Sequence, residues 1–285
     1  MSHRSIEGVT TVIAAGPRSE RWDLVIVGDG FRREDLPVYE TAVATIVATI
    51  LASPPFDELG AAINVHRVDV ISEESGAGNL LSGTTRRTFF ESTFGAHGLD
   101  RLLVTNETLA LSAAIEAVPE MNATLMIVNS ETYGGSGGAV PVFSRAADAW
   151  RIALHEMGHA HFGLADEYAY YSDCTDPARA EYSGPEPVQP NVTSTINPLK
   201  WGGGPAVMLN PDPNECNPAP SPFPAGAVGA FEGAQYFRRG KYRPSFACMM
   251  RDLADPFCTV CRGAIRRVLK PYMPSGARRR WSARH

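Results

Sequence analysis

The feature that most constrains the fold of this chain is an alternation of short apolar segments with longer helix-like segments between residues 20 and 162. The strand-like segments are Leu24–Val27, Ile63–Val70 and Thr124–Val128, and the helix-like segments are Arg33–Leu51, Leu99–Val118 and Arg145–Phe162. The first of these helices shows apolar residues at helical spacing and stops before Pro54-Pro55. Strand–helix–strand order with long connections predicts an α/β fold in which helices cover a twisted sheet.

Composition agrees with a globular protein and excludes several classes. The chain has 285 residues, 44% of them hydrophobic and 20% charged, which rules out wholesale disorder. Its net charge of -5 gives no indication of a nucleic-acid partner. The best apolar run, Thr41–Leu51, falls short of the ~18 residues of a spanning helix, so we expect no membrane span.

Localisation stays open at this point. Met1–Glu7 has no apolar signal core after its one arginine, so either the protein is not exported by that route or a signal has been removed.

A glycine-rich stretch before the third helix predicts a sheet edge. Residues 133–138 read Tyr-Gly-Gly-Ser-Gly-Gly, and Ala139–Phe143 follows with Pro141 inside it. A strand that carries proline belongs at an edge, so we expect an antiparallel edge strand here. Ser144 is the expected N-cap of the next helix.

The second half of the chain has a different texture. More than half of its 22 prolines lie between Pro177 and Pro224. We expect an irregular but ordered region, because Leu199, Trp201, Val207 and Met208 could pack. The predicted organisation is a single domain over residues 1–270, with an α/β part (1–163) and an irregular part (164–270) that ends in a helix over Cys258–Leu269. A basic tail, 271–285, follows.

The motif that carries chemistry is His155-Glu156-Met157-Gly158-His159. On a helix, residues four apart lie on one face, so two imidazoles there can bind one zinc ion. The glutamate beside the first histidine is placed to act as a general base toward the attacking water. The His and Glu frequencies of the chain give only about 0.01 accidental matches. We therefore predict zinc, with His155 and His159 as ligands and Glu156 as the catalytic residue.

Zinc needs a third protein ligand. His161 lies about 200° around the helix from His159 and should face away as a surface or packing residue. Gly163 can end the helix in a left-handed turn, after which Asp166 would return toward the metal. Asp166 is the predicted third ligand, and Glu167 is its rival.

Residues 155–168 as a whole resemble the signature of the bacterial IgA-peptidase family of zinc metallopeptidases, which is similar to the metzincins. In the metzincins a glycine precedes the third ligand by three residues, and Gly163 and Asp166 keep that interval. The sequence departs from the metzincin pattern by one extra residue before the glycine and by Asp in place of His. The resemblance extends over about residues 20–270 in short blocks of sequence. Each block by itself is weakly specific for the family, and the order of the blocks along the chain is the stronger indication. These blocks are Val27–Phe31, Arg67–Gly76, Asn129-Ser130 with Tyr133–Gly135, Trp201, Phe231–Ala234, Tyr242–Ser245 and Cys248–Met250.

The resemblance implies a metzincin-like zincin fold: a mixed sheet, an active-site helix and an irregular C-terminal part. It also implies a methionine in a tight turn beneath the metal, a role for Met249 or its neighbour Met250, with Met249 preferred. The implied activity is that of a zinc-dependent endopeptidase with a protein or peptide substrate. The family name does not fix that substrate, because cleavage of an immunoglobulin depends on groove contacts that the sequence does not reveal.

Substrate binding is expected at the glycine-rich edge. An extended peptide could add there as a strand, and Gly137, Gly138 and Ala139 would let its backbone approach closely. The oxyanion donor is left open among Tyr168, Tyr236 and Tyr242, each of which also suits a structural role. Two other functions remain alternatives: a zinc-stabilised binding module without turnover, which would not need Glu156, and a zinc hydrolase of non-protein amides.

Two further motifs favour structural roles. Gly28-Asp29-Gly30 lacks the third glycine of a dinucleotide loop and predicts a tight turn. Cys248, Cys258 and Cys261 could hold a second zinc only with a fourth ligand that the sequence does not reveal. Disulfides, one among these three and one joining Cys174 to Cys216, are the alternative if the protein is exported, and reduced thiols remain another.

Overall fold

The computed structural model describes residues 5–170, 174–204, 206–212, 214, 216 and 220–276. The chain divides into two compact units, here called unit 1 (residues 1–161 with 268–285) and unit 2 (residues 162–267). Most of the basic tail, residues 277–285, lies outside the described residues.

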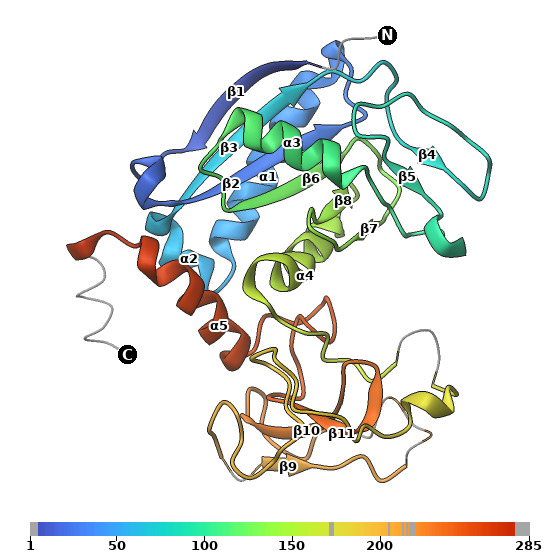
Figure 1. Cartoon of the computed structure of the whole chain (residues 1–285), viewed down its shortest axis with the longest axis vertical. Helices are drawn as coiled ribbons and strands as arrows, with labels where there is room; N and C mark the ends of the chain where they lie inside the picture. Colours follow the sequence, from blue (N-terminus) through green and yellow to red (C-terminus); the bar gives the residue numbers. More distant parts are fainter. Residues whose placement is uncertain are drawn as a thin grey trace. The chain divides into compact units, whose positions relative to one another are not determined.

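Unit 1 is built on a six-stranded mixed sheet in the order β1-β3-β2-β6-β8-β7 (Figure 1). Its strands are β1 (Ile6–Ile13), β2 (Trp22–Asp29), β3 (Ile63–Val70), β6 (Ala123–Val128), β7 (Gly135–Ser136) and β8 (Val142–Ser144). The four inner strands are parallel, and the two edge strands β1 and β7 run antiparallel to their neighbours. The expected mixed α/β architecture is thereby confirmed.

Helices cover both faces of this sheet. They are α1 (Leu36–Ala52), the short α2 (Phe56–Leu59), α3 (Glu107–Ala117) and α4 (Ala149–Phe162). All eight residues of the central strand β2 are buried, as expected of a parallel strand between two helical layers. Val25 and Val27 on one face share a core cluster with Ala110 and Ala114 of α3. Leu24 on the other face lines an apolar pocket with Val47 of α1 and Met157 of α4.

Of the helices in the described residues, one stretch, Arg33–Ala52, is long and apolar enough to cross a membrane by length and composition alone. Its buried side chains are Tyr39, Val43, Ile46, Val47 and Ile50. Their spacing is that of one helix face, and that face is the one expected of a helix packed on a sheet.

A long connection joins β3 to α3 and includes a two-stranded parallel sheet, β4 (Gly78–Asn79) with β5 (Thr93–Phe94). Asp29, at the end of β2, organises it. The Asp29 carboxylate accepts hydrogen bonds from the Phe90 and Ser92 amides, each 2.9 Å, and from Thr88 Oγ1 at 2.8 Å. The tight turn predicted over residues 28–30 is therefore limited to Gly30 (φ +71), because Gly28 and Asp29 still pair with β6 as the end of β2.

The structure corrects two element boundaries. The helix predicted over Leu99–Val118 begins only at Glu107, because Val104 pairs with Thr93 in a β-bridge and the Asn106 side chain caps the helix at the Leu109 amide. Ser144 ends β8 and is not the N-cap of α4, which begins at Ala149.

The edge strand is also displaced from its predicted position. The edge is β7, before the segment Ala139–Phe143, while β8 is an inner strand that begins directly after Pro141. β7 is itself flanked on its outer side, where the Gly135 amide donates to Arg101 O at 3.1 Å.

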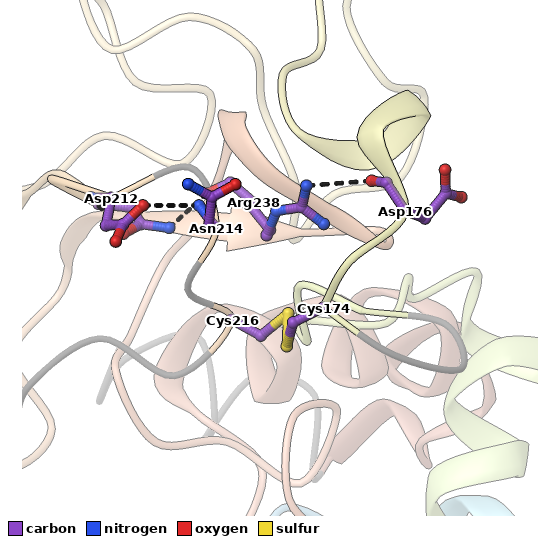
Figure 2. Close-up of a disulfide and its surroundings, with 7 residues drawn as sticks. Cys174, Asp176, Asp212, Asn214, Cys216 and Arg238 are labelled. Carbon is purple, nitrogen blue, oxygen red and sulfur yellow. Dashed lines mark hydrogen bonds between the residues drawn. A yellow bond between two sulfur atoms is a disulfide. The ribbon is translucent and has the colours of Figure 1, made fainter.

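Unit 2 contains a small three-stranded sheet in the order β11-β10-β9. Its elements are β9 (Ala206–Met208), β10 (Gly229–Ala234), β11 (Phe237–Arg243) and the helix α5 (Thr259–Leu269), which extends two residues beyond the unit. A disulfide joins Cys174 to Cys216, one of the predicted alternatives (Figure 2). Near it, Arg238 donates a hydrogen bond of 3.0 Å to the Asp176 carbonyl (Figure 2).

Candidate metal centre and active site

Helix α4 presents the two motif histidines on one face. Leu154, directly before the first histidine, and Met157, between the two, are buried and hold the helix in the core of unit 1. The Nε2 atoms of His155 and His159 lie 3.1 Å apart, and the rings meet nearly at right angles. Two nitrogens that each lie ~2.0–2.1 Å from one zinc ion at a tetrahedral angle are ~3.3 Å apart. The pair therefore fits a shared metal ion.

The carboxylate of Glu156 belongs to the same group. His155, Glu156 and His159 each offer a ligand atom, and these atoms lie within 4.8 Å of one another. His155 is buried, while Glu156 and His159 are partly exposed. A partly exposed carboxylate beside two imidazoles can meet both a metal-activated water and a substrate.

Gly137 lies close to that carboxylate. A Cβ atom at residue 137 would lie 3.1 Å from Glu156 Cδ and closer still to Oε2. The next two residues, Gly138 and Ala139, are exposed. The glycine-rich segment thus lies against the predicted general base and leaves accessible backbone beside it.

His161 faces away from the motif histidines, as the helical spacing predicts. Its Nε2 lies 3.1 Å from Thr124 O on β6, and its ring packs edge-on against Trp22 with centroids 6.0 Å apart. Burial lowers the pKa of His161. This side chain is a packing residue of unit 1.

Helix α4 ends where the sequence predicts. Gly163 has φ +64, the left-handed conformation in which glycine ends a helix. The chain then enters unit 2, and Asp166 is buried there. The hydroxyl of Tyr236 donates a hydrogen bond to Asp166 Oδ2.

The turn that carries Tyr236 is backbone-strained. Gln235 and Tyr236 join β10 to β11 with φ values of 46 and 66, both in the left-handed region that bulky residues rarely adopt. The two amides of the turn donate to Asp166 O at 3.0 Å and Tyr168 O at 3.1 Å. Burial and the charge of Asp166 raise the pKa of Tyr168. The strain is maintained because the turn is hydrogen-bonded to the Asp166 segment.

Glu167 serves different neighbours from Asp166. It is fully buried, and its Oε1 accepts hydrogen bonds from Asn191 Nδ2 at 2.9 Å and from the Cys261 thiol at 3.1 Å. Burial, reinforced by the nearby Cys258, raises the pKa of Glu167 to about 8. Asp166 and Glu167 are consecutive, yet their carboxylates contact separate sets of side chains.

Met249, the methionine preferred from the resemblance, lies in a tight turn. The Arg251 amide donates to Cys248 O at 2.8 Å and closes the turn, and both Met249 and Met250 are buried. The Glu167 amide donates to Met250 O at 2.7 Å. The turn is thereby tied to the segment that carries Asp166 and Glu167.

Sequence reasoning missed two residues that shape these surroundings. Asn191 clamps the segment through Ala165, with bonds of 2.8 Å to both its amide and its carbonyl. Glu107, the first residue of α3, accepts from the Val140 amide at 3.1 Å and holds the glycine-rich segment. Neither position carries a local motif, so only the fold shows these contacts.

A comparison with protein families decides the relationship. The family model described as IgA Peptidase M64 matches residues 10–223 and 217–269, which is most of the chain. The chain belongs to the IgA Peptidase M64 family. As a member of a peptidase family, it is assigned to the hydrolases, with protein as its substrate class. A comparison with curated proteins finds no match.

Membership of IgA Peptidase M64 confirms the resemblance drawn from residues 155–168. The groups that could hold a metal in the described residues include His155, Glu156 and His159 on α4.

Proposed function

We propose that this M64 peptidase is a zinc-dependent endopeptidase with a metzincin-like active site. The observation that carries the proposal is the arrangement on α4, where two imidazole nitrogens lie 3.1 Å apart and one carboxylate stands beside them. A purely structural helix has no need to bring two imidazole nitrogens and a carboxylate together on one face. A zinc ion, when bound, polarises the scissile carbonyl and lowers the pKa of water.

Glu156 is the proposed general base and general acid. It accepts a proton as the water oxygen attacks the carbonyl carbon of the scissile peptide. It then delivers that proton to the leaving nitrogen as the C–N bond breaks. The products are a carboxylate and a free amine, and Glu156 is regenerated. Because Gly137 has no side chain, it leaves room for the Glu156 carboxylate at this position.

Asp166 is the proposed third ligand, beside His155 and His159. The proposal rests on its interval after Gly163 and on the use of its neighbour, since the Glu167 carboxylate is already engaged by Asn191 and Cys261. The Tyr236 hydroxyl hydrogen-bonds Asp166 and would orient it, as partners of metal ligands commonly do. Met249 is the proposed methionine of the turn beneath the site.

Gly137, Gly138 and Ala139 are the proposed substrate contacts. β8 is paired on both sides and β7 is flanked by residue 101, so neither can take up a peptide as a further strand. The exposed backbone of Gly138 and Ala139 remains accessible next to Glu156. A substrate would therefore bind at this irregular segment, through a few backbone hydrogen bonds.

The decisive experiment compares wild type with Glu156→Gln on a mixed-peptide library. We expect the variant to keep the zinc of the α4 site and to lose activity by ~10² or more, because only the proton acceptor is removed. His161→Gln is the matched control on the same helix, and it should keep both metal and activity. Equal cleavage by wild type and Glu156→Gln would exclude the general-base assignment.

Metal content separates the alternatives. His155→Ala and His159→Ala should each lower bound zinc by about one ion per chain. Zinc binding without hydrolysis of any peptide in the library would support a binding module. Hydrolysis confined to non-peptide amides would support a zinc hydrolase of non-protein amides.

A further inference from the structure

Unit 2 contains a second cluster of metal-binding side chains, separate from α4. It consists of Glu167, Cys248, Cys258 and Cys261, here called the cysteine cluster. The four side chains offer ligand atoms that all lie within 4.8 Å of one another, and all four residues are buried. The sequence shows only the three cysteines, and the structure supplies the missing fourth ligand.

The distances in the cysteine cluster fit a tetrahedral zinc site. Two sulfurs that each lie ~2.3 Å from one zinc ion are ~3.8 Å apart at a tetrahedral angle. The sulfurs of Cys248 and Cys261 lie 3.7 Å apart. Cys261 Sγ lies 3.1 Å from Glu167 Oε1, somewhat shorter than the ~3.5 Å expected of a sulfur and an oxygen on one zinc ion. The cluster would need only small adjustments to bind the ion.

Glu167 has an unused acceptor inside the cluster. Its Oε1 accepts two hydrogen bonds, whereas its Oε2 is buried and has no hydrogen-bond partner among the described residues. A buried carboxylate oxygen without a partner is costly, and a cation relieves that cost. This oxygen is an observation independent of the cysteines.

The backbone around the cysteines suits thiolates. Cys258 directly precedes α5 and Cys261 lies in its first turn, where the helix dipole favours negative charge. The Cys258 amide donates to Cys248 Sγ at 3.3 Å. Metal-bound thiolates gain from such donors.

Charge also favours a divalent cation. Three thiolates and one carboxylate carry a formal charge of −4, and the guanidinium groups of Arg243 and Arg251 interact with Glu167 electrostatically. Arg243 is buried, and its Nε has no hydrogen-bond partner in the described part of the chain. One zinc ion would bring this buried group of charges to neutrality.

We propose that Glu167, Cys248, Cys258 and Cys261 form a structural zinc site in unit 2, distinct from the site on α4. Four protein ligands leave no position for water, as is typical of structural zinc sites. The ion would cross-link the segment after α4, the turn at Cys248–Arg251 and the start of α5. Its loss would loosen unit 2, independently of any proton transfer by Glu156.

The test uses the His155→Ala/His159→Ala double variant, which lacks the two imidazole donors of the α4 site. We expect the purified double variant to retain about one zinc per chain, and its X-ray absorption fine structure to show sulfur ligands at ~2.3 Å. Adding Cys258→Ser should remove this zinc. Adding Cys174→Ser and Cys216→Ser instead should leave it bound, because the disulfide cysteines are not ligands.

Mass spectrometry of the unreduced chain tests whether two of the three cysteines form a disulfide instead of binding zinc. After denaturation in a chelator, Cys248, Cys258 and Cys261 should all react with a thiol-alkylating reagent. A disulfide between two of them, or a double variant without zinc, would overturn the proposal. Either result would leave the assignment of Glu156 untouched, whereas equal cleavage by Glu156→Gln would leave the cysteine cluster untouched.

Discussion

At the scale of single residues, the proposed chemistry depends on the Glu156 carboxylate, which lies against Gly137. Gly137 lies so close to Glu156 that any Cβ atom would contact the carboxylate. Its φ is not in the left-handed region, so the backbone itself would accept alanine. The constraint on residue 137 is therefore the space beside Glu156, the proposed general base.

Gly137→Ala should reduce peptide hydrolysis by about tenfold or more, because small displacements of a catalytic group are costly. Zinc content should not change, since neither histidine is touched. Steady-state kinetics and metal analysis of the purified variant measure both quantities. Gly60→Ala is the matched control, because a Cβ there meets only Leu51 at an ordinary 3.8 Å. A variant as active as wild type would show that the carboxylate does not need this room.

Residue patterns predicted this site unevenly. The imidazole pair follows from its spacing on a helix, since four residues complete about one turn. The two neighbours Asp166 and Glu167 could not be separated from sequence, because nothing local shows that Asn191 and Cys261 engage one of them. The hydrogen bond from Tyr236 to Asp166 could not be predicted, because the hydroxyl reaches Asp166 only through a strained turn.

At the scale of elements, periodic segments were predicted well and tertiary pairings poorly. β3 has its predicted bounds, and α1 begins three residues later than predicted, because their apolar periods are long and clear. The segment before α3 was wrongly predicted as helix, because a β-bridge between Val104 and Thr93 overrides its helix propensity. The β10–β11 hairpin was missed because its turn, Gln235-Tyr236, has neither Gly nor Asn.

Helix α4 should respond to pH through His161. Burial lowers the pKa of this imidazole in the folded protein below its ordinary value of ~6.5. The unfolded chain therefore binds a proton before the folded chain does as pH falls. The free energy of unfolding should decrease from about pH 6.5 downward, and this contribution should be absent above it.

Denaturant unfolding at a series of pH values, for wild type and His161→Gln, measures this effect. The variant should lose less stability between pH 7.5 and pH 5.5, since its amide can still contact Thr124 O but does not titrate. Parallel pH profiles of the two proteins would exclude His161 as a source of acid sensitivity.

At the scale of the whole molecule, the two units are stabilised differently. Unit 1 has a large apolar core on both faces of its sheet, whereas the buried side chains of unit 2 include many polar and charged groups. Unit 2 adds the disulfide, whose cysteines are 42 residues apart. Cross-links supplement an apolar core of limited size.

The Cys174→Ser/Cys216→Ser double variant should be less stable than wild type. Closing a loop of this length restricts the unfolded chain and contributes up to about 4 kcal/mol. The urea midpoint of the variant without reductant should be correspondingly lower. Equal midpoints would show that the loop is held by packing alone. Zinc on α4 should be retained, because the histidines lie outside this loop.

The adjacent positions of Asp166 and Glu167 limit which insertions and deletions the chain can accept during evolution. One short stretch of chain supplies neighbouring carboxylates to two different surroundings. Gain or loss of one amino acid between Gly163 and Asp166 would shift this assignment by one position and disturb both at once. Point mutations can adjust either carboxylate separately, but natural length variation should be confined to other parts of unit 2.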